Sequence, residues 1–157
     1  MNDYLLIAII FYCSIVLHEL LHAIGYKICG LNIKKFYIFP FDLIFSDSFK
    51  VRFAFEKNCV GLVIPQNSNE YTEKQLRRKI IIGLASPIVG HLILSIAGGI
   101  AYFVYDMDIY LNVSLVNVLC VFSTFIRNEN VLGDSIALYH IFICDELSKE
   151  IMEIDGL

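Results

Sequence analysis

Residues Tyr4 to Tyr26 read YLLIAIIFYCSIVLHELLHAIGY, a stretch whose first thirteen residues are almost wholly apolar. A helix needs about 20 residues to cross the hydrocarbon core of a bilayer, and this stretch is long enough. It therefore predicts a first transmembrane helix over residues 4–26, with three ionisable side chains near its end: His18, Glu19 and His22. No Lys or Arg precedes the apolar run and no small-residue cleavage pattern follows it, so we expect this helix to stay attached.

The segment His18-Glu19-Leu20-Leu21-His22 has the spacing HExxH. Side chains four residues apart share one face of a helix, so both imidazoles can bind a single Zn²⁺ while Glu19 reaches a water on the metal. Inserting an Asp, Lys or Arg side chain into a membrane helix costs about 2.5–3.5 kcal/mol of free energy. A bound cation would offset such a cost for the polar groups clustered here. His18 and His22 are thus candidate metal ligands and Glu19 the candidate catalytic base, the alternatives being a chance match or a degenerate remnant.

Two imidazoles do not complete a zinc site, so a third protein ligand is expected from elsewhere in the chain. The charge pattern predicts that Arg127 lies on the same side of the membrane as the HExxH motif. Asp134 follows Arg127 on that side and is therefore the leading candidate. Asp134 also precedes an apolar run and has the position of a helix N-cap, which is its alternative role. The rival third ligands are Glu129, His91 and His140.

Composition places the chain among membrane proteins, because it is 57% hydrophobic and 18% charged, against roughly 45–50% and about 25% in soluble domains. Its five cysteines include no CxxC pair, which predicts neither a disulfide framework nor a cysteine zinc site. Ten of the twelve basic residues lie between Lys27 and Lys79, so we expect residues 27–79 to be cytoplasmic and the N-terminus outside. No aromatic platform accompanies the basic run, and a nucleic-acid partner is not expected.

The remainder of the chain predicts further membrane helices and a small β-rich insert. The short runs IKKFYIF, FKVRFAF and CVGLVI within residues 33–65 indicate a small sheet or hairpin at the membrane surface. Thr72 and Gln75 resemble a capping box that begins the next helix. Spans over residues 80–105 and 109–126 and a short helix over 135–150 complete a single domain, residues 1–157, of an α-helical integral membrane protein with three core transmembrane helices.

The second predicted span contains Pro87 among small residues, which permits a kink and close helix contact. A helix of this kind can form the wall against which a substrate is held. The candidate substrate-binding residues are therefore Ser86, Pro87, Gly90 and His91. For His91 we favour a packing or pocket role over metal ligation.

Three of these segments together resemble the site-2 protease family of intramembrane zinc metalloproteases: HELLH, Gly83 to Gly90 (GLASPIVG), and Gly133-Asp134. The resemblance covers most of the chain and implies a minimal bacterial member that uses zinc held by His18, His22 and Asp134. It also implies that an edge strand of the β-rich insert pairs with an extended substrate. The implied partners are the lipid bilayer and a transmembrane or hydrophobic peptide, cleaved near the cytoplasmic face.

The alternative from another class is a non-catalytic membrane protein, such as an immunity-type factor that binds a hydrophobic peptide and retains the metal motif. That protein would work normally without Glu19, whereas a protease would not. A metal transporter is disfavoured because the second and third spans offer few polar residues to form a path.

Overall fold

The computed structural model describes residues 3–45, 49–54, 61–66, 71–125, 127–128, 131–132 and 138. Its helices are α1 (Asp3–Ile28), α2 (Glu73–Tyr105) and α3 (Asp108–Ser123). Its strands are β1 (Ile33–Ile38), β2 (Phe41–Phe45), β3 (Phe49–Phe53), β4 (Gly61–Pro65), β5 (Arg127–Asn128) and β6 (Val131–Leu132). Asp134, and all of the predicted helix 135–150 except Leu138, lie outside the described residues.

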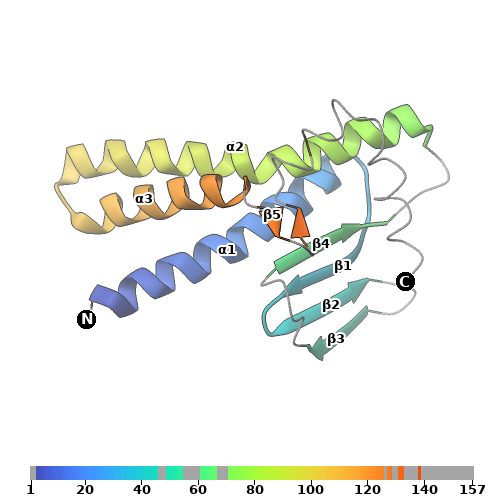
Figure 1. Cartoon of the computed structure of the whole chain (residues 1–157), viewed down its shortest axis with the longest axis horizontal. Coiled ribbons are helices and arrows are strands. Elements are labelled where there is room, and N and C mark those ends of the chain that lie inside the picture. Colours follow the sequence, from blue (N-terminus) through green and yellow to red (C-terminus); the bar gives the residue numbers. More distant parts are fainter. Residues whose placement is uncertain are drawn as a thin grey trace.

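Two of the helices are long and apolar enough to cross a membrane: α1 over Tyr4–Ile28 and α2 over Lys74–Tyr105. The shorter α3 returns antiparallel to α2 after a tight turn in which Asp106 adopts the left-handed conformation, with φ of 50° (Figure 1). The 16 residues of α3 rise about 24 Å, less than the roughly 30 Å of a hydrocarbon core. The first two predicted spans therefore correspond to long apolar helices, and the third stays a prediction.

The start of α2 is fixed to the end of α1. The predicted capping box is confirmed: the Gln75 amide donates to the Thr72 hydroxyl over 3.4 Å, and the Thr72 amide donates to the Gln75 side chain over 3.0 Å. One turn later the Lys79 ammonium donates to the Cys29 carbonyl and lies 4.1 Å from the centre of the Tyr71 ring. These contacts set the position of α2 beside the end of α1 that carries the HExxH motif.

The predicted small sheet is confirmed, as four antiparallel strands in the order β3-β2-β1-β4. Sequence reasoning missed β2, the segment FDLIF, because Asp42 interrupts its apolar residues. In the structure Asp42 is fully buried, and the Arg52 guanidinium on β3 donates to its carboxylate over 2.8 Å. Strand β4 forms one edge of the sheet and contacts α1, so the sheet lies beside the HExxH end of the helices (Figure 1).

Small residues let α1 and α2 approach closely, as expected from the sequence. A Cβ atom added at Gly83 would overlap the Tyr26 ring, and one added at Gly90 would overlap the Leu21 side chain. Pro87, between these two glycines, is less than 2% exposed. The contact between α1 and α2 is therefore tight where the HExxH motif lies.

Candidate active site

His18 and His22 lie one turn apart on α1, and their ring centres are 4.9 Å apart with ring planes at 82°. Two imidazoles that bind one tetrahedral zinc ion through bonds of about 2.0–2.1 Å have ring centres roughly 5 Å apart. His22 is buried at 6% exposure. The two side chains therefore fit the spacing that a shared Zn²⁺ requires.

The backbone of α2 orients the His22 ring of α1 through a hydrogen bond. Its Nδ1 lies 2.9 Å from the carbonyl oxygen of Gly83. A carbonyl can only accept, so Nδ1 carries the hydrogen and donates it, which leaves the lone pair on Nε2. Metal-binding histidines commonly have this arrangement, in which one nitrogen is tied to a second partner and the other binds the metal. No local pattern in the sequence indicates this bond, because it joins residues 61 positions apart.

Glu19 is 7% exposed, although it carries a carboxylate, and its side chain lies against Gly61 at the start of β4. A Cβ atom added at Gly61 would be 2.5 Å from Glu19 Oε1. Only a glycine at this strand position leaves room for the carboxylate. The Glu19 carboxylate thus lies against the edge strand of the sheet, next in sequence to His18. Gly61 was not among the predicted site residues, and a glycine within an apolar β run was the signal for it.

His91 of α2 is fully buried, and its ring stacks on that of His18, with ring centres 5.3 Å apart and ring planes at 22°. The Asn117 amide on α3 donates to the Val113 carbonyl over 2.7 Å, so its oxygen faces His91 Nδ1 at 2.6 Å. Nδ1 therefore carries the hydrogen, and the lone pair of Nε2 is buried with no hydrogen-bond partner within the described part of the chain. Sequence reasoning missed Asn117, whose signal was an amide side chain in the middle of an apolar helix.

The structure brings together four of the predicted site residues: His18, Glu19, His22 and His91. Among the described residues no group of three or more His, Cys, Asp or Glu side chains is placed to hold a metal ion. The predicted third ligand and two of its rivals, Asp134, Glu129 and His140, lie outside the described residues. The other predicted substrate-binding residues form the contact between α1 and α2: Ser86 faces Gly25, Gly90 faces Leu21, and Pro87 is buried.

Comparison with known proteins supplies the family. The family model for Peptidase family M50 matches residues 6–152, which is nearly the whole chain. No curated protein and no solved structure matches significantly. The matched region contains the paired imidazoles and the buried glutamate. The chain therefore belongs to peptidase family M50, the site-2 protease family of membrane metalloproteases.

Proposed function

We propose that the protein is a zinc-dependent intramembrane endopeptidase that cleaves a transmembrane or hydrophobic peptide near the cytoplasmic face of the membrane. One observation carries the proposal: the His18 and His22 rings are spaced for one metal ion, and the buried carboxylate of Glu19 lies beside them on an apolar helix. A buried carboxylate needs hydrogen bonds or an ionic partner to offset its loss of hydration, and a metal ion held nearby would be such a partner. Family membership supports the peptidase reaction.

In this proposal His18, His22 and Asp134 are the residues that would hold the zinc ion. A zinc ion held by these residues would supply Lewis-acid chemistry that lowers the pKa of water. Glu19 takes a proton from the attacking water and delivers it to the nitrogen of the leaving amine. The hydrogen bond from His22 to Gly83 keeps the ring in the orientation that ligation requires.

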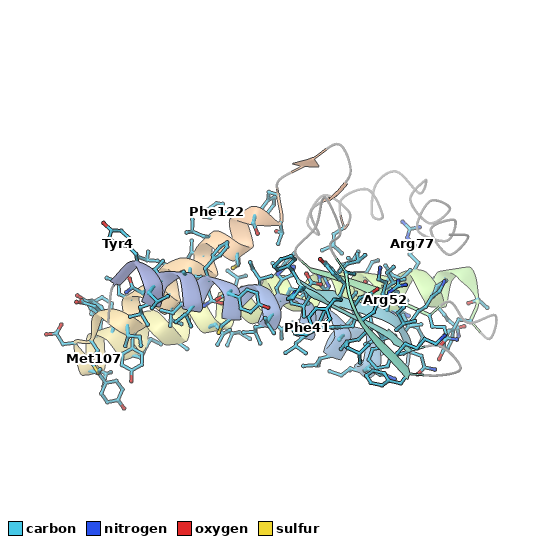
Figure 2. The ribbon with its side chains drawn as sticks, turned by 90° about the horizontal axis from the view of Figure 1, so that it is seen from below. Tyr4, Phe41, Arg52, Arg77, Met107 and Phe122 are labelled. Carbon is cyan, nitrogen blue, oxygen red and sulfur yellow. The ribbon has the colours of Figure 1, made fainter. Side chains whose placement is uncertain are left out.

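The orientation we propose places the N-terminus outside and residues 27–79 on the cytoplasmic side. Figure 2 shows Arg52 and Arg77 at one end of the molecule and Tyr4 and Met107 at the other. The basic end is the one expected to face the cytoplasm. The HExxH motif lies nearer to that end of α1, so water reaches the zinc site from the cytoplasmic side.

The substrate is proposed to bind as an extended strand along β4. Peptide groups within a membrane helix are already hydrogen-bonded, so cleavage requires the helix to unwind locally and its main chain to find new partners. Strand β4 is an edge strand that begins at Gly61, beside the Glu19 carboxylate. A substrate strand paired with this edge exchanges main-chain hydrogen bonds with it and is delivered to the catalytic base.

His91 is proposed to bind the substrate through Nε2, which is buried without a hydrogen-bond partner within the described part of the chain and would accept a hydrogen bond from a main-chain N–H of an unwound segment inserted beside it. A glutamine side chain can place its oxygen near the position of Nε2, whereas an asparagine mimics only the Nδ1 side of the ring. We expect His91→Gln to bind substrate nearly as well as the parent and His91→Asn to bind it about tenfold more weakly, a loss of about 1.4 kcal/mol. The measurement is the affinity for a labelled single-span peptide, with each variant also carrying Glu19→Gln so that the peptide is not cleaved.

The control for this pair is Ser114→Ala, which removes a different hydrogen bond between α3 and α2, from Ser114 to the Ser95 carbonyl over 2.8 Å. It should leave peptide binding unchanged. The opposite order, in which asparagine is tolerated and glutamine is not, would assign His91 to helix packing through Asn117 alone.

The experiment that tests the proposed function measures zinc and cleavage together. Purified protein in lipid nanodiscs should contain one zinc ion per chain and cleave single-span peptides, and a chelator should stop cleavage until zinc is added back. Asp134→Ala should lose most of its zinc because three protein ligands are needed to hold the metal.

Glu129→Ala is the matched control, since Glu129 is a rival ligand from the same segment and should be dispensable. Full zinc occupancy in Asp134→Ala would reassign the third ligand. A wild-type protein that binds no zinc would overturn the proposed function.

A further inference from the structure

Pro87 lies inside α2, four residues after Gly83. In an α-helix the N–H of each residue donates to the carbonyl four residues earlier, and proline has no N–H to donate. The Gly83 carbonyl is therefore without its helical donor. In the structure this same carbonyl oxygen lies 2.9 Å from His22 Nδ1 and accepts its hydrogen.

Glycine at position 83 is the second requirement of this contact. A Cβ atom there would overlap the Tyr26 ring, which stacks on the His22 ring with 6.2 Å between ring centres. The absence of a side chain lets α1 approach until His22 reaches the carbonyl. Because His22 is 6% exposed and Pro87 less than 2%, little solvent reaches this contact to replace either partner.

We propose that Pro87 is a positioning residue for the metal centre. Its missing N–H reserves the Gly83 carbonyl for His22, and the proline ring pushes that carbonyl out of line with the helix axis, toward α1. The carbonyl then fixes the hydrogen on His22 Nδ1 and leaves Nε2 to bind the metal. This proposal rests on the proposed function, because it assigns His22 as a zinc ligand.

An N–H at position 87 would compete for the carbonyl. Pro87→Ala supplies that N–H and restores the helical bond to Gly83, which draws the carbonyl back toward the helix axis. Lactic acid at position 87 has the side chain of alanine and an ester in place of the amide, so it removes the N–H without restoring the ring. The two variants separate the missing donor from the shape of proline.

The experiment measures zinc affinity by competition with a chromophoric chelator, on the full chain in nanodiscs. Pro87→Ala should bind zinc about tenfold more weakly, as for loss of an outer-shell partner, and the lactic acid variant should return to within about threefold of the parent. An ester at the exposed Ile93, elsewhere in α2, controls for ester insertion and should leave affinity unchanged.

A second readout does not involve zinc. In the metal-free protein, ¹⁵N NMR of labelled histidine should show the Nδ1–H tautomer of His22 in the parent and ester variants, and a mixture of tautomers in Pro87→Ala. Parent-like affinity and tautomer in Pro87→Ala would overturn the proposal, as would equal defects in the alanine and ester variants. These outcomes leave zinc binding and cleavage by the parent intact, whereas failure of the proposed function would abolish both.

Discussion

Glu19→Gln is expected to stop peptide cleavage while the protein keeps its zinc. Glutamine has nearly the same shape as glutamate but cannot take a proton from water, and a general base contributes about 10²–10⁴-fold to such a reaction. Because Glu19 is the only ionisable side chain between the two histidines, we expect a fall of about 10³–10⁴-fold in the cleavage rate of a single-span peptide in nanodiscs. Zinc content measured on the same preparations should be unchanged.

The matched control is Asp106→Asn, at the turn between α2 and α3. Asp106 adopts the left-handed conformation, which asparagine also tolerates, and it lies far from the histidines along α2. Its cleavage rate should equal that of the parent. If Glu19→Gln retains the biological activity of the protein in cells, the chain acts as a peptide-binding factor and not as a protease.

The motif and the long helices could be predicted from the sequence because they depend on local patterns. The HExxH spacing follows from the period of a single helix, and the capping box involves only Thr72 and Gln75, which are three residues apart. Strand β2 was missed because the burial of Asp42 depends on Arg52 of the neighbouring strand. A local pattern could not include that partner.

The surroundings of the site could not be predicted, because they are contacts between distant segments. The bond from His22 to Gly83 joins α1 to α2, and the bond from His91 to Asn117 joins α2 to α3. From the sequence, Pro87 was interpreted as part of a wall that holds the substrate. Its missing N–H leaves the Gly83 carbonyl without a helical donor, and only the structure shows that this carbonyl lies beside His22. Local sequence thus indicates candidate reactive groups, and the tertiary structure shows the contacts that surround them.

Gly61→Ala is expected to reduce cleavage by about 10²-fold, because the added methyl group takes the place of the Glu19 carboxylate. Its Cβ would lie 2.5 Å from Oε1 and 2.6 Å from Cδ, closer than real Cβ contacts allow. The glutamate side chain must therefore leave its present position, and its contribution as a base, about 10²–10⁴-fold, is partly lost. The measurement is kcat with a single-span peptide, and zinc content should stay at that of the parent.

Val51→Ala is the control, since Val51 is an exposed residue of β3, at the other edge of the sheet, and should have little effect on kcat. A double-mutant cycle then separates a displaced base from a damaged substrate strand. Glu19→Asp shortens the side chain by one methylene and makes room for the methyl group, so Gly61→Ala should cost much less in that background than in the parent. An equal cost in both backgrounds, with the loss in KM instead of kcat, would show that Gly61 serves only the pairing of β4 with substrate.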